Sequence, residues 1–378
     1  MRRLEGIVLR LLLGSLAGLL LAEAGTRLYL TWAPGVDGDY LSDRDTDYRL
    51  RHGAESDTVG FGYVNRLGFR DREPTEPKPP GVRRVIGIGD SFVLGEVAPS
   101  DNFLRVAERE LAAVADSPRT EILMMGLGGY GPEQYVGVLR ACALPLQPDE
   151  IVLCFYVGND VLGLATRSVV RRGVLYPTSS ADRGLDLLRR SWLFAMLEHG
   201  WAARQRHAGR DAGTGPQPAS PEVLGNRKTE RWYRTILRHR LPVFAREPAP
   251  RTARLWSAAE DRLEEFHRLC LDAGVPWSLV LIPDEIQVDD ALRGRILPAL
   301  TGTPDAYDFD APQHRLQAWA AARGVPLLDL LAPMRARCAE GELLYRIANT
   351  HWNEAGNREA GRILAEALRA PYPGRTSP

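Results

Sequence analysis

From residue 84 onward, short apolar runs alternate with longer segments in which hydrophobic residues recur at helical spacing. The apolar runs are residues 84–89, 121–125, 150–156, 277–282 and 326–330. The helical patterns are residues 102–114, 133–143, 255–273, 313–322 and 354–368. Runs of four to eight apolar residues are typical of buried strands, and strands that alternate with helices form parallel sheets covered on both faces. The pattern predicts an α/β fold, a three-layer α/β/α domain with a mostly parallel sheet.

Polar and glycine residues mark where the predicted helices begin and end. Ser100 or Asp101 is expected to cap the first helix, because a side-chain oxygen there can accept an unpaired helical N–H. Gly274 and Gly324 are expected to end the helices that precede the last two strands. In such a sheet, ligands bind beyond the carboxyl ends of the strands.

The first thirty residues are apolar on nearly all sides. Arg2 and Arg3 precede a stretch from Ile7 to Ala22 with few polar interruptions. A helix of a soluble protein keeps one polar face, so this pattern indicates a membrane anchor or an export signal. We favour an uncleaved, single-pass transmembrane helix over residues 1–32 of a bacterial membrane protein, with the rest outside the cytoplasm, in the periplasm. The alternative is secretion after cleavage near Ala24.

The remaining chain divides by composition. Residues 33–80 are rich in Gly, Asp, Arg and Pro and are expected to form an extended spacer with an edge strand near 61–64. The main folded domain is expected at 81–372. A polar, turn-rich insert interrupts it at about 165–250, with helical character around 185–202.

Charge and cysteine content exclude several classes of function. The 48 basic and 48 acidic residues balance, so no net field attracts nucleic acid, and none is expected as a partner. The cysteines form no C-x-x-C pair, which argues against a zinc site and a redox motif. Free, buried thiols are favoured over a disulfide; the residues are Cys142, Cys154, Cys270 and Cys338.

Three predicted strands end in loops whose residues suit acyl-ester chemistry. Gly89-Asp90-Ser91 ends the first strand, so the Ser91 hydroxyl is expected to enter the crevice and its backbone N–H to face an oxyanion. The glycine-rich loop 126–131 lets backbone approach a ligand closely. Asn159, after the third strand, offers a neutral amide donor. Each loop alone is an ordinary turn or helix cap; their shared edge of the sheet indicates a site.

His351 is the candidate general base. It lies in Asn-Thr-His-Trp-Asn at residues 349–353, directly before the last predicted helix. Like the three loops described above, it follows a segment of the predicted sheet and precedes a helix. The remaining six histidines lie in the spacer, the insert or helical patterns, where surface positions are expected.

Together these blocks resemble the signature blocks of the SGNH/GDSL hydrolase superfamily, in its membrane-anchored bacterial form with a C-terminal His-Trp-Asn block. The matching segments are Val-Ile-Gly-Ile-Gly-Asp-Ser-Phe (85–92), Gly-Tyr-Gly-Pro-Glu-Gln (129–134) and His-Trp-Asn-Glu-Ala-Gly (351–356). The resemblance, over residues 83–358, implies a flavodoxin-like SGNH fold with Ser91 as nucleophile and His351 as base. It also implies an oxyanion hole made by the N–H groups of Ser91 and Gly129 and the Asn159 side chain. The mechanism requires no metal and no cofactor.

The chain departs from the family pattern ahead of the histidine. Asn349 stands two residues before His351 and Ala348 three before, where the family has Asp. That acid orients the imidazole and stabilises its protonated form. The oxygen of Asn349 can accept the ring N–H without supplying charge, so we include it in the catalytic set. Asp160, or another acid from elsewhere in the fold, is the alternative source of charge.

Three functions stay open. The first is hydrolysis of an ester with a small acyl group, such as O-acetyl on envelope or extracellular polysaccharide, through an acyl-enzyme on Ser91. The second, implied by resemblance to alginate acetyltransferases, is acyl transfer to a polysaccharide acceptor. The third, favoured by Asn349, is an impaired domain that binds a glycan or an envelope partner. The expected partners are an ester substrate and the membrane; the oligomeric state stays open.

Overall fold

The structure, a computed structural model, is described for most of the chain and divides into two compact units. The described residues are 2–32, 40–53, 63–114, 119–165, 167–171, 174–178, 191, 193–194, 197, 227–301, 303–346 and 349–369. One unit comprises Met1–Ser42 and Arg167–Pro218, and the other comprises Asp43–Thr166 and Ala219–Pro378. The candidate site lies wholly in the second unit.

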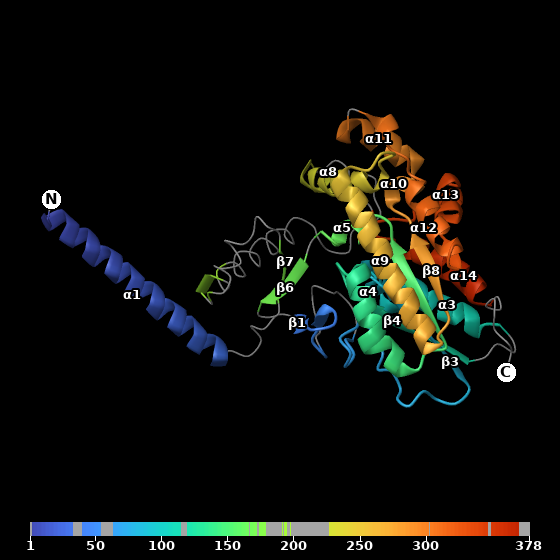
Figure 1. The fold of residues 1–378 in the computed structure, drawn as a ribbon, viewed down its shortest axis with the longest axis horizontal. Coiled ribbons are helices and arrows are strands. Elements are labelled where there is room, and N and C mark those ends of the chain that lie inside the picture. The colour runs from blue at the N-terminus through green and yellow to red at the C-terminus, as the bar shows by residue number, and fades with distance from the viewer. Residues whose placement is uncertain are drawn as a thin grey trace. The chain divides into compact units, whose positions relative to one another are not determined.

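A parallel five-stranded sheet forms the centre of the larger unit (Figure 1). Its strands are β3 (Val82–Gly89), β4 (Arg119–Gly126), β5 (Glu150–Tyr156), β8 (Trp277–Ile282) and β9 (Leu327–Asp329). Their order is β4-β3-β5-β8-β9. From β3 the chain first adds β4 on one side and then crosses back to add β5 on the other side. In a doubly wound sheet, the ligand crevice opens at the carboxyl ends of two neighbouring strands where the strand order switches in this way.

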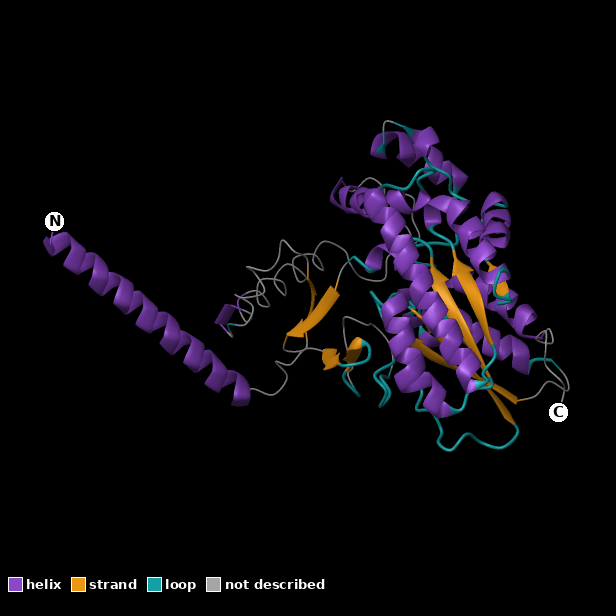
Figure 2. Ribbon diagram, in the orientation of Figure 1, coloured by secondary structure: helices purple, strands orange, loops and turns teal. Residues whose placement is uncertain are grey.

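Helices cover both faces of this sheet (Figure 2). Those between β3 and β5 are α2 (Ser91–Leu94), η1 (Pro99–Asp101), α3 (Phe103–Ala112), α4 (Pro132–Val138), η2 (Leu139–Ala143) and η3 (Leu144–Leu146). The later ones are α5 (Asp160–Gly163), α8 (Arg227–Arg240), η6 (Leu241–Phe244), α9 (Pro250–Ala273), α10 (Glu285–Val288), α11 (Asp290–Leu300), η7 (Pro304–Ala306), α12 (Ala311–Ala321), α13 (Leu331–Ala339) and α14 (Glu354–Arg369). Helix α3 packs against α14, and α4 packs against α9.

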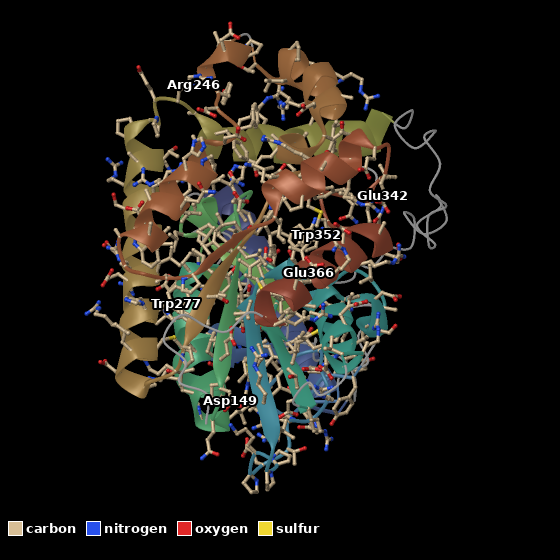
Figure 3. All side chains as sticks on the ribbon, turned by 90° about the vertical axis from the view of Figure 1, so that its right-hand side faces the viewer. Asp149, Arg246, Trp277, Glu342, Trp352 and Glu366 are labelled. Atoms are coloured by element: carbon tan, nitrogen blue, oxygen red, sulfur yellow. The ribbon has the colours of Figure 1, made fainter. Side chains whose placement is uncertain are left out.

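The core beneath α3 and α14 also holds the loop that precedes α14. Trp352 is only 1% exposed, and its ring meets Phe92 at 4.8 Å and Phe103 at 5.6 Å between centroids. Figure 3 labels Trp352 within the folded body and Asp149 near one end of the sheet. Burying a side chain of this size stabilises by about 2–3 kcal/mol. Because Trp352 is anchored in the core, the position of its neighbour His351 is restrained.

The smaller unit begins with a long helix, α1 (Arg2–Trp32). Its span Arg10–Tyr29 has 20 residues, is long and apolar enough to cross a membrane, and is almost wholly exposed. At about 1.5 Å per residue this span is about 30 Å long, the thickness of a bilayer core. Signal sequences share this length and composition. The unit also contains an antiparallel hairpin, β6 (Arg167–Arg171) with β7 (Val174–Thr178).

The predicted α/β/α fold is confirmed, including the five strands in the predicted order along the chain. Strands β5 and β8 begin and end at the predicted residues. Gly274 and Gly324 follow their helices with φ of +64° and +65°, the left-handed geometry that ends a helix.

Some element boundaries were wrong. The cap of α3 is Asn102, whose side chain accepts from the Leu104 N–H at 2.9 Å, whereas Ser100 and Asp101 belong to the short turn before it. The helix predicted over 133–143 is an α-helix only as far as Val138 and continues as a π-helix and then a 3₁₀ turn. In the π-helical turn the Leu144 N–H donates to the Leu139 carbonyl, and Pro145, which has no N–H, lies in the 3₁₀ turn that follows.

The segment ahead of the sheet differs from the prediction as well. Residues 63 and 64 lie outside any strand, and residues 61 and 62 lie outside the described part. The strands here are β1 (Tyr40–Asp43) and β2 (Asp47–Leu50). From Asp43 the predicted spacer already belongs to the compact unit of the sheet. Of the predicted insert, most of 172–226, including nearly all of the helix expected at 185–202, lies outside the described residues.

Candidate active site

Ser91 is the first residue of α2, directly after the turn that ends β3. Asp90 caps α2, and its carboxylate accepts from the Phe92 N–H at 2.9 Å. The Ser91 hydroxyl lies 3.3 Å from the other carboxylate oxygen. This turn points the serine outward from the carboxyl end of the strand, while Phe92 and Val93 enter the core.

The structure brings His351 to Ser91 across 260 residues of sequence. The distance from His351 Nε2 to Ser91 Oγ is 2.8 Å, a full hydrogen bond. Thr350, directly before the histidine, has a φ of +68°, which is uncommon for a residue with a β-branched side chain. A strained residue beside a hydrogen-bonded histidine is typical of a loop whose surroundings dictate its shape.

The other ring nitrogen of His351 faces two oxygen-bearing side chains. Nδ1 lies 2.7 Å from Oδ1 of Asn349 and 3.1 Å from its backbone carbonyl. It also lies 3.3 Å from Oε1 of Glu96. The second oxygen of Glu96 accepts from the Asn349 side-chain amide at 2.8 Å. The three side chains therefore form one connected group on the side of the imidazole away from Ser91.

Glu96 is a residue that sequence reasoning missed. The sequence singles out only the positions ahead of the histidine and Asp160, and leaves an acid from elsewhere in the fold unnamed; Glu96 follows the nucleophile by five residues. The available signal was an acidic side chain just after α2, the short helix that begins at Ser91. Asp160, the named alternative, is engaged elsewhere: one of its oxygens accepts from the Tyr156 N–H and the Tyr135 hydroxyl, both at 2.9 Å.

The other two predicted loops meet the serine turn. A side chain added at Gly126 would lie 2.8 Å from the Asp90 carbonyl, so the end of β4 packs directly on that turn. The Tyr48 hydroxyl donates to the Gly128 carbonyl at 2.9 Å and steadies the glycine loop. Gly129 has a φ of +82°, which favours glycine at that position.

Asn159 reaches the same place from the end of β5. Its side chain interacts with the buried carboxyl of Asp90 and opposes the rise in the pKa of that group. An amide NH₂ group can donate two hydrogen bonds, so Asn159 is chemically suited to serve a ligand as well. The predicted residues Ser91, His351, Asn349 and Asn159 thus form a single cluster, and the loop of Gly129 borders it.

Two buried carboxyl groups lie beneath this cluster. Burial raises the pKa of Asp90, although the Phe92 N–H and the His351 charge oppose that shift. Burial also raises the pKa of Asp160 well above its ordinary value, and the nearby Asp90 charge adds to the rise. Both carboxyls are held by hydrogen bonds from β5, the serine turn and their neighbours.

Among the described residues, no group of three or more His, Cys, Asp or Glu side chains could hold a metal ion.

Comparisons with known proteins give matches among solved structures. No protein-family model matches the chain, and no curated protein matches it. An acetyl xylan esterase is 13% identical, with 75% of this chain and 99% of that chain covered and a TM-score of 0.41. A lipase/acylhydrolase from Enterococcus faecalis is 14% identical, with 76% and 95% covered and a TM-score of 0.38.

A G-D-S-L family lipolytic protein from Veillonella parvula is 13% identical, with 76% of this chain and 99% of that chain covered and a TM-score of 0.36. The fold of this chain is established by its own parallel sheet in the order β4-β3-β5-β8-β9.

Proposed function

We propose that this chain is a serine ester hydrolase of the SGNH/GDSL type, with Ser91 as nucleophile and His351 as general base. The observation that carries the proposal is the 2.8 Å contact between Ser91 Oγ and His351 Nε2. A serine within hydrogen-bond distance of a base that is itself oriented by further side chains is the usual arrangement of an activated nucleophile.

The proposed reaction has two steps. Ser91 Oγ attacks the ester carbonyl carbon while its proton passes to His351 Nε2. The tetrahedral oxyanion accepts hydrogen bonds from the N–H groups of Ser91 and Gly129 and from the Asn159 amide. The alcohol leaves with the proton from His351, and an acyl-enzyme remains on Ser91. Water then attacks this ester with His351 as base, which releases the carboxylic acid and restores Ser91.

The proposed substrate is an ester of a small acyl group, such as O-acetyl on envelope or extracellular polysaccharide. The support is the apolar span Arg10–Tyr29, which suits an anchor that holds the domain at a membrane surface. Acyl transfer to a polysaccharide hydroxyl is the second candidate. It uses the same acyl-enzyme, with a sugar hydroxyl in place of water.

The test is turnover of p-nitrophenyl acetate and butyrate by the full chain in mild detergent. We expect Ser91→Ala and His351→Ala each to lower kcat by about 10³-fold or more. Ser257→Ala and His314→Ala are matched controls, because both residues are exposed on helices α9 and α12. Wild-type activity that survives in Ser91→Ala would refute the proposal.

Hydrolysis and transfer are separated with an acetylated donor labelled in the acetyl group and a polysaccharide acceptor. Label that appears as free acetate supports hydrolysis. Label that appears on the polysaccharide supports transfer, with Ser91 still as the acyl carrier. A folded wild type without either product would contradict both candidates and leave the glycan-binding alternative.

A further inference from the structure

We propose that Glu96 is the acid that serves His351, acting as a positioning residue through Asn349 and directly on Nδ1; this rests on the proposed function of Ser91 and His351. Its Oε1 lies 3.3 Å from His351 Nδ1, and its Oε2 accepts from Asn349 Nδ2 at 2.8 Å. The carboxylate thus faces the ring nitrogen that does not contact Ser91.

The hydrogen bonds have a consistent direction. For Nε2 of His351 to accept the Ser91 proton, Nδ1 must carry the ring hydrogen. That hydrogen points to Asn349 Oδ1 at 2.7 Å, and the amide of Asn349 donates in turn to Glu96. A negative charge on the donor side of an amide makes its oxygen a stronger acceptor. The Glu96 carboxylate therefore polarises the Asn349 amide, whose oxygen then stabilises the protonated imidazole although Asn349 carries no charge.

The backbone around Glu96 is held on both sides. Gly95 ends α2 with a φ of +74°, and its N–H donates to the Ser91 carbonyl at 2.9 Å. Val97 is 3% exposed, and its carbonyl accepts from the Arg70 guanidinium at 2.9 Å. Since the loop is tied to the nucleophile by one bond and to the core by another, Glu96 is directed at the site by fixed neighbours.

Other charges face the same group and limit the size of the effect. Arg346 lies 3.9 Å from Glu96 Oε2. Burial lowers the pKa of Arg70, which is only 3% exposed, and the Glu96 charge opposes that shift. Asp90, on the Ser91 side, is the second acid that interacts with His351. Because the Glu96 side chain is 37% exposed, solvent screens its charge. We expect an effect of roughly 10- to 100-fold, smaller than the ~10⁴-fold of a buried triad acid.

The first test is Glu96→Gln, which keeps the shape and removes the charge. We expect kcat/KM for p-nitrophenyl acetate to fall roughly 10- to 100-fold and the acidic limb of the pH profile to move to lower pH. The limb moves because the protonated imidazole loses a stabilising charge. Glu96→Asp should recover part of the loss. Glu110→Gln, at an exposed position on α3, is the matched control and should leave both quantities unchanged.

The second test moves the charge. Asn349→Asp in the Glu96→Gln background restores a carboxylate beside Nδ1, so we expect kcat/KM to recover. In the wild-type background the same change sets two carboxylates about 2.8 Å apart, and we expect no gain. A gain from Asn349→Asp in both backgrounds, equal in size, would overturn the role of Glu96.

The third test needs no substrate and so separates this proposal from the proposed function. The Nδ1 proton of His351 is followed by NMR in histidine-labelled full chain and is assigned by its loss in His351→Ala. We expect Glu96→Gln to shift this resonance upfield. A resonance that Glu96→Gln leaves in place overturns the inference, even if Ser91→Ala abolishes activity. A shift without esterase activity in the wild type supports the contact and rejects the proposed reaction.

Discussion

At the scale of single residues, burial sets the protonation of Glu285 at the start of α10. Its side chain accepts from the Tyr233 hydroxyl, and the residue is 7% exposed. Burial is the largest cause that raises its pKa to about 8, and the charges of Asp284 and Asp289 add to the rise. The hydrogen bond from Tyr233 and the charge of Arg240 oppose it. Glu285 is thus a neutral acid in the folded protein at moderately acidic pH.

This predicts a pH-dependent stability that Glu285→Gln removes. The folded-state pKa lies above the unfolded value, so the contribution is fully present below pH ~4.5 and is lost as pH rises towards 8. From pH 5 to pH 8 we expect wild type to lose about 2–5 kcal/mol relative to Glu285→Gln. Urea unfolding at both pH values measures this difference, with Glu110→Gln as control. Equal pH dependence in wild type and Glu285→Gln would contradict it.

At the scale of elements, Arg84 joins the strands and connectors at the amino end of the sheet. It lies on β3 with no exposed surface, and its guanidinium donates to the Glu121 carboxylate on β4 at 2.5 Å. It also donates to the carbonyls of Leu146 at 2.7 Å and Thr75 at 2.8 Å. One side chain therefore supplies hydrogen-bond donors to carbonyl groups of two connecting segments and to a carboxylate on the neighbouring strand.

Arg84→Ala should destabilise the protein without altering the chemistry. The change removes the donor from the Glu121 carboxylate, which is only 18% exposed, and from two backbone carbonyls. We therefore expect the free energy of unfolding to fall by about 3–5 kcal/mol. Ser91 lies at the opposite end of β3, and kcat per folded molecule should stay at the wild-type value. Arg362→Ala removes exposed ion pairs on α14 and should cost less than about 1 kcal/mol. Thermal unfolding of both variants distinguishes the two sites; similar losses would refute the claim.

At the scale of the whole molecule, α1 has the length and composition of a membrane anchor or an export signal. The leucines from Leu11 to Leu28 are exposed, including Leu16 at 54% and Leu20 at 61%, and the span Arg10–Tyr29 matches a bilayer core in length. An uncleaved anchor keeps the full mass of the chain in the membrane. A cleaved signal releases a shorter chain.

We expect the intact chain in the membrane fraction after carbonate extraction. Replacing Leu16 and Leu20 together with Arg, near the middle of the span, should reduce insertion, because each charge costs about 2.5–3.5 kcal/mol there. Leu28→Arg, towards the end of the helix, is the matched control and should be tolerated better. Intact mass spectrometry decides between anchor and signal: a mature protein that begins after residue 24 would overturn the anchor.

Much of the fold was determined by the sequence itself. Apolar runs of strand length and helices at regular spacing are local properties, so β5 and β8 were predicted to the residue. Element ends that depend on tertiary contacts were not predicted to the residue. Asn102 caps α3 because its side chain accepts from the Leu104 N–H and donates to the Val93 carbonyl. The role of residues 43–80 was also missed, since packing of Phe69 and Val64 into the core is not a compositional signal.

For the site, the sequence determined which residues were candidates, and the tertiary structure decided which of them meet. Local motifs and strand ends were enough to single out Ser91, Asn159 and His351. The link of His351 to Glu96 was out of reach, because the two are 255 positions apart in sequence and neither lies in a local pattern that names the other. Side-chain contacts across such a separation are created only when the sheet and the loop before α14 fold together, and this is where the acid missing at position 349 is found.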